Sequence, residues 1–348
     1  MFENKNNRTE LSELGEFGLI EHISKSVKLS NKTTVKGIGD DAAVIDNTAG
    51  MTVLTSDMLI EGIHFDLTFS PLKHLGYKAV VVNLSDVYAM NARPNQVLVN
   101  IGVSNRFSLE AIEEFYAGVL LACEKYGVDL AGGDTTSSQH GFIISVTAIG
   151  VAANDKITYR NGAKVNDLIC VTGDLGAAYV GLQLLEREKK IFLENPNIQP
   201  DFEGHDYILE RQLKPETQKW LIEELEKAKV VPTAMIDISD GLSSEIIHIC
   251  TQSEKGCQLY EDKIPVDHQT VLMADEFNLS PSVCALNGGE DYELLFTVSQ
   301  KDFEKVKAIK NIHFLGYITE ATEGINLINK ADQAIPLRAQ GWNALNKD

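Results

Sequence analysis

Five short segments of the sequence combine one or two aspartates with neighbouring small residues. They are GIGDDAA at 37–43, TSD at 55–57, LSD at 84–86, GGD at 132–134 and DISD at 237–240. An aspartate just beyond an apolar run reaches the rim of the core, where open-sheet proteins tend to place ligands. A single such segment is more simply a turn, because Asp, Gly and Ser form local hydrogen bonds there. Together, the five segments predict a site at which several carboxylates converge.

Converging carboxylates raise one another's pKa values unless cations neutralise them. The possible metal ligands in these segments are oxygens of Asp, Ser and Thr, with His64 nearby in sequence and no cysteine pair. This set suits Mg²⁺ better than zinc or copper. Calcium is less favoured, because DISDGLSSE begins like an EF-hand loop but has the wrong carboxylate spacing. Since Mg²⁺ is usually held by a few carboxylates together with phosphate oxygens, the pattern predicts a polyphosphate substrate.

The strongly acidic composition limits the partners. Fifty acidic and 31 basic residues give a formal charge of -19, which repels nucleic acids and anionic membranes and would repel ATP too unless bound cations reverse the local field. Common phosphate loops are missing, because the sequence contains no Gly-Lys dipeptide and no G-x-G-x-x-G turn. We expect no nucleic-acid or membrane partner.

The N-terminal residues and the cysteines predict a cytoplasmic protein. The first ten residues, MFENKNNRTE, lack the apolar stretch of a signal peptide, and no apolar run approaches the ~20 residues that cross a bilayer. The five cysteines include no C-x-x-C pair, which is typical of reduced, buried thiols.

Strand-like and helix-like segments alternate along the chain and would position the aspartates. MTVLTSD at 51–57 and GFIISVTAIGV at 141–151 have the β-branched density of buried strands, whereas apolar residues recur at helical spacing over 109–123. The stretch 71–90 contains VVV, yet its length and Pro71 at the first turn favour a helix. The sequence therefore predicts an α/β protein.

The chain is long enough for two domains, because 348 residues exceed the usual size of one hydrophobic core. A break near 151–157 precedes the strand-like DLICVTGD and places the domains at 1–152 and 153–348. The charged, proline-containing stretch 186–215 is predicted to be a helix end followed by a surface excursion without chemistry.

Seven motifs, read in order, resemble the signature series of the thiamine-monophosphate kinase family, which belongs to the aminoimidazole-ribonucleotide-synthetase-like (PurM-like) superfamily. They are GIGDDAA, TSDMLIEGIHF, YKAVVVNLSDVYAM, GGDTT, YRNGAKVND, DISDGLSS and NGGEDYELLF. The resemblance runs from about Glu16 to near the C-terminus and departs mainly in the N-terminal lead and at 186–215. It implies an N-terminal α/β domain whose mixed sheet forms a homodimer interface, and a C-terminal α/β domain that closes over the nucleotide.

The resemblance also implies a set of site residues. The positions that match metal ligands, for several Mg²⁺ ions, are Asp41, Thr55, Ser56, Asp57, Asp86, Asp134, Asp237 and Asp240. Positions that match ATP contacts are Gly133, Asp134, Arg160 and Ser239. Positions that match contacts to thiamine monophosphate are His64, Glu290 and Trp342. The catalytic set is Asp57, Asp86, Asp134 and Asp240.

Four of these residues have simpler alternative interpretations. Arg160 could be a surface arginine, although its fork suits phosphate oxygens and the turn after it would leave it projecting. His64 lies between apolar residues and could be an ordinary core or surface histidine. Trp342 could pin the C-terminal tail or stack on a cationic thiazolium. Glu290 could be a solvated loop carboxylate or could accept hydrogen bonds from an aminopyrimidine.

The expected reaction needs no general base, because a phosphate monoester with a second pKa near 6 is already anionic at neutral pH. Two anionic phosphates must approach in line, so bridging cations are required and a phosphoenzyme is not. Two alternatives remain open at this point: another ATP-dependent synthetase of the superfamily, or a non-enzymatic acidic metal-binding protein.

Asp57→Asn is expected to lower turnover of ATP and thiamine monophosphate by about 10²-fold or more while the fold survives, because it removes a metal-binding charge. Steady-state kinetics alongside circular dichroism checks this. Near-normal activity in the folded variant would contradict the metal assignment.

Overall fold

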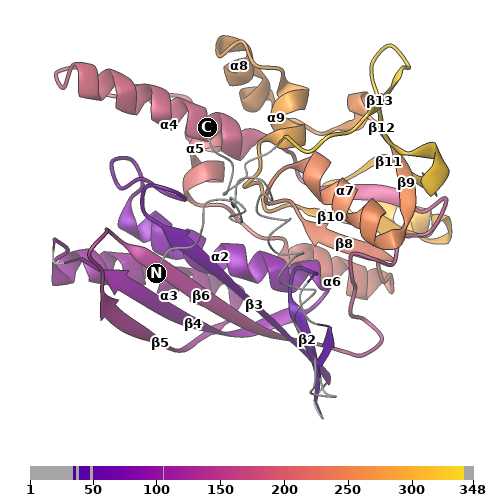
Figure 1. Ribbon diagram of the computed structural model, residues 1–348, viewed down its shortest axis with the longest axis horizontal. Helices are drawn as coiled ribbons and strands as arrows, with labels where there is room; N and C mark the ends of the chain where they lie inside the picture. The colour runs from indigo at the N-terminus through magenta and orange to yellow at the C-terminus, as the bar shows by residue number, and fades with distance from the viewer. Residues whose placement is uncertain (1–33, 37–38, 48–49, 105, 341–348) are drawn as a thin grey trace, which may run out of the picture.

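Two β-sheets organise the protein (Figure 1). The computed structural model describes residues 34–36, 39–47, 50–104 and 106–340. The strands of the first sheet are β1 (Thr34–Lys36), β2 (Ala43–Asn47), β3 (Gly50–Ile60), β4 (Arg93–Val103), β5 (Asp129–Ser137) and β6 (Ile143–Ala152). The strands of the second sheet are β7 (Leu168–Thr172), β8 (Ala234–Asp237), β9 (Lys255–Tyr260), β10 (Leu294–Val298), β11 (Ile312–Glu320), β12 (Ile325–Ile328) and β13 (Ala334–Pro336).

Helices connect and cover these sheets. The α-helices are α2 (Leu72–Ala89), α3 (Leu109–Tyr126), α4 (Ala177–Glu194), α5 (Asp206–Leu213), α6 (Lys219–Ala228), α7 (Leu242–Ser253), α8 (His268–Glu276), α9 (Pro281–Asn287) and α10 (Phe303–Lys307). Short 3-10 turns are η2 (Glu261–Lys263), η3 (Gln300–Asp302) and η4 (Ala321–Glu323). The predicted α/β class and the arrangement in two sheets are confirmed.

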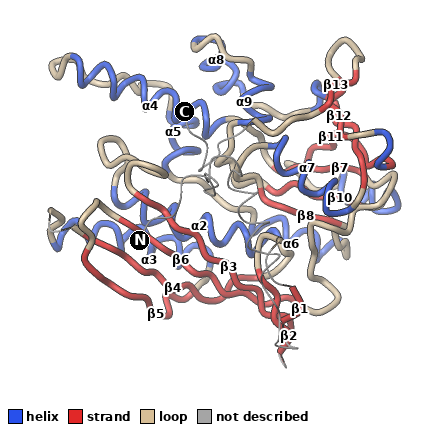
Figure 2. Tube along the Cα trace, viewed as in Figure 1, coloured by secondary structure: helices blue, strands red, loops and turns tan. Residues whose placement is uncertain are grey.

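The first sheet has the strand order β1-β2-β3-β6-β4-β5. It is mixed, because β4 and β5 run parallel while the other neighbours are antiparallel. Buried and half-buried residues alternate along β6, as in a strand with one face on the core. Helices α2 and α3 cover that face (Figure 2). The register pairs Asp57 with Val146 and Val146 with Val99, so these three residues share the covered face.

Helix α2 confirms the prediction of a helix over 71–90. Most of its 18 residues are buried, because it packs against the first sheet and also against Met235 of β8 in the second. A helix that is apolar all round belongs in the interior. Its few buried polar side chains must therefore find partners there; they are Lys78, Asn83 and Ser85.

The second sheet has the strand order β13-β12-β9-β11-β7-β10-β8 and is antiparallel except between β12 and β9. Its strand β7 confirms the prediction made from DLICVTGD. Both faces of this sheet are buried at β8, because Met235 belongs to the core shared with α2 while the next residue, Ile236, packs in the core with α7.

The prediction of a surface excursion over 186–215 is wrong for its second half. Residues Asp206–Leu213 form α5, in which Ile208 and Gln212 are buried. Helix α5 crosses α4 closely at Gly181, where an added Cβ would lie 2.1 Å from the carbonyl oxygen of Ile208. The charged composition hid the i, i+4 pair that faces the interior.

Three further predictions concern the chain as a whole. All five cysteines are buried and free, as predicted. Within the described ranges, no helix is both long and apolar enough to cross a membrane. The division into domains at 152/153 remains a proposal, and the hydrophobic core around α2 includes residues of both sheets.

Gly118→Ala is expected to lower the free energy of unfolding by at least about 2 kcal/mol, because it would overpack the crossing of α3 and α2. A Cβ at Gly118 would lie 1.9 Å from the carbonyl oxygen of Lys73. Urea denaturation measures the loss. Gly102→Ala is the control, since its Cβ would come no closer than 3.5 Å to any neighbouring atom; equal stability of the two variants would contradict the close crossing.

Candidate active site

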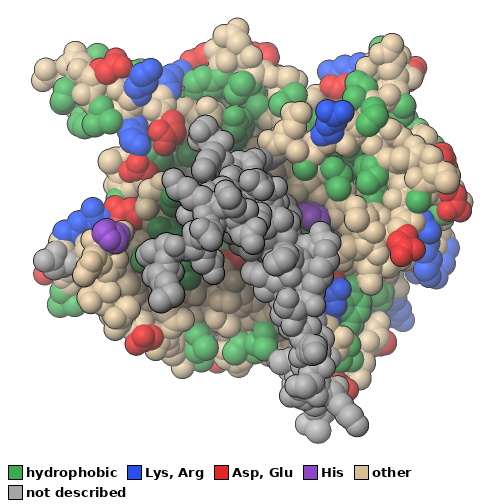
Figure 3. Space-filling model, viewed as in Figure 1, with side chains coloured by type: hydrophobic (Ala, Val, Ile, Leu, Met, Phe, Trp, Pro, Cys, Tyr) green, Lys and Arg blue, Asp and Glu red, His purple; other side chains and the backbone are tan. Residues whose placement is uncertain are grey.

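A cavity of about 790 Å³ is lined by residues from both halves of the chain. The first half contributes β3, the following loop 61–70 and α2, and the second half contributes α4, α5 and the loops after β8 and α9. Figure 3 shows the molecule hollowed between α4 and the first sheet, with hydrophobic side chains in the hollow. The cavity also carries the carboxylates of Asp57, Asp86, Asp237 and Asp240.

Three of the predicted metal ligands converge, as the sequence predicted. Carboxylate oxygens of Asp41, Asp86 and Asp237 lie within 4.8 Å of one another. The Thr55 hydroxyl donates to Asp86 Oδ2 at 2.6 Å, and the Ser85 hydroxyl donates to Asp237 Oδ2 at 2.6 Å. The second of these bonds links α2 to β8, so the cluster joins the two halves of the chain.

Crowding and burial raise the pKa values of Asp86, Asp237 and the neighbouring Asp57. Burial raises the pKa of Asp86 well above its ordinary value, and the charge of Asp57 adds to the shift. Burial and the charge of Asp41 likewise raise the pKa of Asp237 well above its ordinary value. The same two causes raise the pKa of Asp57 to about 6. The folded protein thus favours either protons or a cation at this cluster.

Asp57 lies on the covered face of β3 and lines the cavity beside the cluster. Its backbone N–H donates to Asn83 Oδ1 of α2 at 3.0 Å, and Asn83 Nδ2 donates to the carbonyl oxygen of Ala79 at 3.0 Å. Because Asn83 is buried with both groups of its amide bonded, it fixes β3 against α2 at the position of Asp57.

The Arg160 side chain is only 17% exposed and is paired with acidic side chains, so the expectation that it projects is wrong. Its Nε donates to Asp41 Oδ2 at 3.1 Å, and its Nη2 donates to Asp41 Oδ1. Its backbone N–H donates to Asp40 Oδ2 at 3.3 Å. Burial opposes its charge, but Asp41 and Asp40 together raise the pKa of Arg160 above its ordinary value. A fork engaged by a carboxylate has the geometry that would also engage a phosphate.

Ser56 and Asp134 do not join the cluster within one chain. The Ser56 hydroxyl donates to the carbonyl oxygen of Val146 at 3.2 Å and accepts from Thr147 at 3.0 Å on the uncovered face of the sheet. Asp134 lies on the exposed edge strand β5. Across β4 and β6, the strand pairing aligns it with Met58 of β3 and not with Asp57. Three strand spacings of ~4.8 Å separate β5 from β3, or about 14 Å.

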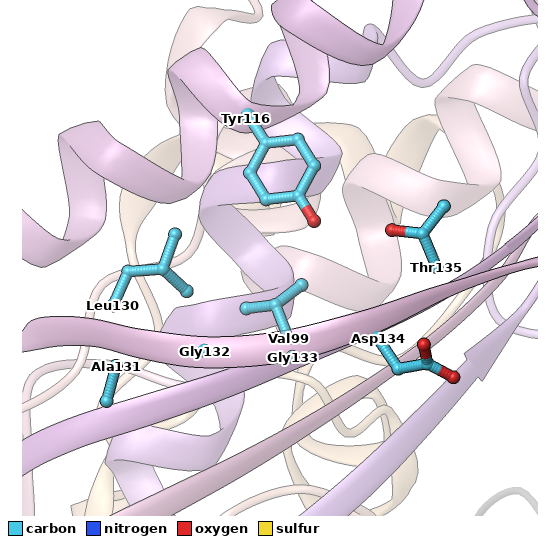
Figure 4. Close-up of a pocket in the computed structure, with 8 residues that line it drawn as sticks. All are labelled: Val99, Tyr116, Leu130, Ala131, Gly132, Gly133, Asp134 and Thr135. Carbon is cyan, nitrogen blue, oxygen red and sulfur yellow. The ribbon is translucent and has the colours of Figure 1, made fainter.

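Asp134 and Gly133 line a second cavity of about 410 Å³ beside β5. The ring of Tyr116, from α3, lies on one side of the strand and the Asp134 carboxylate points away on the other (Figure 4). Only glycine fits at Gly133, because φ is +156° and a Cβ would lie 1.8 Å from the carbonyl oxygen of Val99. The GGD segment is thus an exposed backbone surface with a carboxylate beside it.

The remaining predicted contacts that lie within the described residues all border the larger cavity. His64 accepts the backbone N–H of Ile60 on Nδ1 at 3.0 Å, so the proton of its neutral ring is on Nε2. The carbonyl oxygen of Ser239 accepts the backbone N–H of Glu290 at 2.7 Å, which brings the DISD and NGGED segments together. Asp240 and Ser239 line the cavity with Glu290. Trp342 lies outside the described residues.

Sequence reasoning missed several residues that line these cavities, among them Lys78, Gln212, Tyr292 and Tyr116. Lys78 and Tyr292 lie inside motifs that the sequence singled out, YKAVVV and GGEDYE, but no chemical pattern marked them. Burial raises the pKa of Tyr292 well above its ordinary value, and the charges of Glu290 and Asp57 add to the shift, so its hydroxyl stays neutral.

The residues present fit Mg²⁺. The converging group consists of three carboxylates, and a threonine hydroxyl bonded to one of them adds another oxygen. Hard oxygen donors are the ligands that this ion prefers. The bidentate contact of Arg160 offsets only part of the negative charge.

The chain is similar to known proteins along nearly all its length. The model of the AIR synthase related protein, N-terminal domain, matches residues 39–152. Thiamine-monophosphate kinase of Buchnera aphidicola (subsp. Schizaphis graminum) is 35% identical over 95% of this chain and 99% of that protein, and that of Bacillus subtilis is 33% identical over 95% and 99%. The solved structure of AaThiL complexed with AMPPCP and TMP is 30% identical, covers 97% of this chain and 99% of that one, and has a TM-score of 0.83.

Mg²⁺ is expected to raise the melting temperature more at pH 7.5 than at pH 5. A carboxyl such as Asp57, whose pKa rises from 3.8 to about 6 on folding, favours the folded state while it is protonated, and this contribution is lost as the pH rises through 6. Mg²⁺ replaces the lost proton. Differential scanning calorimetry with NaCl of equal ionic strength as control measures the shift; an equal shift at both pH values would contradict the account.

Proposed function

The chain belongs to the thiamine-monophosphate kinase family, and we propose that it transfers the terminal phosphoryl group of ATP to thiamine monophosphate, giving thiamine diphosphate and ADP with Mg²⁺. The observation that carries this proposal is the buried carboxylate cluster at the cavity between the two halves of the chain. The relatives align over almost the whole chain, and a similar structure holds AMPPCP, an analogue of ATP, together with TMP.

The described residues act by placing charge rather than by forming a covalent intermediate. Asp41, Asp57, Asp86 and Asp237 would hold Mg²⁺, which when bound would neutralise the two phosphates and stabilise charge on the group in transfer. The acceptor phosphate is already anionic near neutral pH, so the cavity needs no general base. Transfer is therefore direct and in line.

Arg160 is proposed to pass from Asp41 to a phosphate of ATP when cations occupy the cluster. Its guanidinium already forms two hydrogen bonds with Asp41, so the exchange of one anion for another preserves this kind of bond. Ser239 is proposed to contact the nucleotide and Asp240 to bind its cation, because both line the cavity beside Asp237.

The thiamine half of the acceptor is proposed to lie against His64 and Glu290, with Trp342 as a further contact. Both described residues line the cavity together with apolar side chains that suit a flat heterocycle; among these are Phe69, Leu182 and Leu279. A carboxylate such as Glu290 accepts hydrogen bonds that an aminopyrimidine can donate.

A homodimer would explain why Ser56, Gly133 and Asp134 lie apart from the cluster. They occupy the uncovered face and exposed edge of the first sheet, where Met58 is 54% exposed. We propose that this face pairs with a second copy and that Gly133 and Asp134 then contribute to the partner subunit's nucleotide site. The buried free cysteines agree with a cytoplasmic location, which we also propose.

The reaction is tested by ³¹P NMR of the protein with ATP, Mg²⁺ and thiamine monophosphate. We expect signals of ADP and thiamine diphosphate, and none without Mg²⁺. ATP consumption only with an amide or carboxylate acceptor would favour a synthetase of the same superfamily, and nucleotide binding without turnover would favour a non-enzymatic metal-binding protein.

Subunit complementation tests the dimer. Asp57→Asn and Asp134→Asn should each be nearly inactive alone, but after co-expression about a quarter of wild-type activity should return, because half of the dimers are mixed and one of their two sites is intact. Differently tagged chains allow the mixed dimer to be purified. Activity no higher than that of the single variants would place Asp134 in its own chain's site or exclude the dimer.

A further inference from the structure

Three side chains from distant parts of the sequence meet at the wall of the larger cavity. The Lys78 ammonium of α2 lies 3.0 Å from Glu290 Oε1. The Gln212 amide of α5 donates to Glu290 Oε2 at 2.8 Å, and Lys78 also donates to the carbonyl oxygen of Gln212 at 3.1 Å. All three residues line the cavity. Each oxygen of the Glu290 carboxylate thus has its own donor.

The burial of Lys78 ties it to these partners. Its side chain is only 7% exposed, and a buried ammonium is costly unless it is paired and hydrogen-bonded. Within the described part of the chain, the partners of the Lys78 ammonium are the Glu290 carboxylate and the carbonyl oxygen of Gln212 at the end of α5. A lysine that formed only a solvent-exposed ion pair would not need to be buried at the cavity wall.

The orientation of the Gln212 amide is fixed by the carboxylate. If the amide were flipped, its oxygen would face Glu290 Oε2, another acceptor, so the nitrogen must lie on that side. The opposite atom, Gln212 Oε1, is then buried with no hydrogen-bond partner among the described residues. A buried acceptor left unsatisfied in a native fold calls for an explanation, and holding Glu290 supplies one.

The backbone also holds Glu290 in one conformation. Its φ is +57°, in the left-handed region, and its N–H donates to the carbonyl oxygen of Ser239 at 2.7 Å. Gly289 before it fits because a Cβ there would lie 2.4 Å from the same oxygen. Side-chain and backbone contacts therefore leave this carboxylate little freedom.

We infer that Lys78 and Gln212 are positioning residues that hold the Glu290 carboxylate so that its remaining lone pairs accept the amino group of the substrate's pyrimidine. A carboxylate has about four acceptor positions, and the two donors use only part of them. This inference rests on the proposed function, in which Glu290 contacts thiamine monophosphate. Lys78 and Gln212 come from different halves of the chain, so the pyrimidine site is complete only where the halves meet.

The test compares thiamine monophosphate with its analogue that carries an oxo group in place of the pyrimidine amino group. A site that accepts a hydrogen bond from the amino group discriminates against this analogue. The variants are Lys78→Met, Gln212→Met and Glu290→Gln, and Lys73→Met is the control because Lys73 is an exposed lysine on the same helix. Each is measured for kcat and for KM toward ATP and both acceptors, with melting temperatures alongside.

We expect Lys78→Met and Gln212→Met to raise KM for thiamine monophosphate roughly ten-fold, to leave KM for ATP unchanged, and to reduce the discrimination between the two acceptors by a similar factor. Lys78→Arg should restore part of it. In the Glu290→Gln background, Lys78→Met should add little, because both changes act through one carboxylate.

A purely structural role would give a different result. Lower kcat with unchanged KM and unchanged acceptor discrimination in both variants would overturn the inference, as would full additivity with Glu290→Gln. If Lys78→Met does not fold, Gln212→Met decides alone by the same criteria. Absence of turnover in the wild-type protein would instead refute the proposed function, so the two failures are distinguishable.

Discussion

Electrostatic repulsion among buried aspartates is the constraint on which the site depends. Oxygens of Asp41, Asp86 and Asp237 are held within 4.8 Å of one another, in surroundings where burial already disfavours a charged carboxylate. Among the described residues, the hydroxyls of Thr55 and Ser85 donate to Asp86 and Asp237, and the Arg160 guanidinium donates to Asp41. Only protons or metal cations can relieve the remaining repulsion. The same requirement explains how a chain with a net charge of -19 can accept an anionic nucleotide.

Helix α2 connects the aspartate cluster to both halves of the chain. It is buried between the two sheets, and its polar side chains point to partners in both halves of the chain: Asn83 to the backbone of β3, Ser85 to Asp237 of β8, and Lys78 to Glu290. Each bond satisfies a group that would otherwise be costly to bury. The site therefore forms only when the two halves of the chain pack against each other.

Much of the site could be predicted from the sequence, because each aspartate proposed to bind a cation lies in a short segment that can be recognised without the fold. The same reasoning overlooked strand geometry. Thr55 and Ser56 are neighbours on β3, and successive side chains of a strand point to opposite faces, so the two cannot serve one cluster from a regular strand. The alternation of side chains along a strand can be applied to the sequence alone.

Other features depended on tertiary contacts. Helix α5 has a charged sequence, and its buried pair Ile208 and Gln212 gains meaning only from the crossing at Gly181. The pairing of Lys78 with Glu290 spans more than two hundred residues, and no local pattern marks it. Arg160 was identified as an anion-binding side chain, but its engagement with Asp41 follows from the fold alone.

The most direct measurement of the central claim is calorimetric titration of AMPPCP into the protein with Mg²⁺ and with EDTA. Cations that neutralise the cluster should make binding strongly dependent on Mg²⁺, with no measurable heat in EDTA and an affinity that rises as Mg²⁺ is added. Equal affinity in EDTA and in Mg²⁺ would show that the aspartates do not need a cation to admit the nucleotide, and would contradict the account.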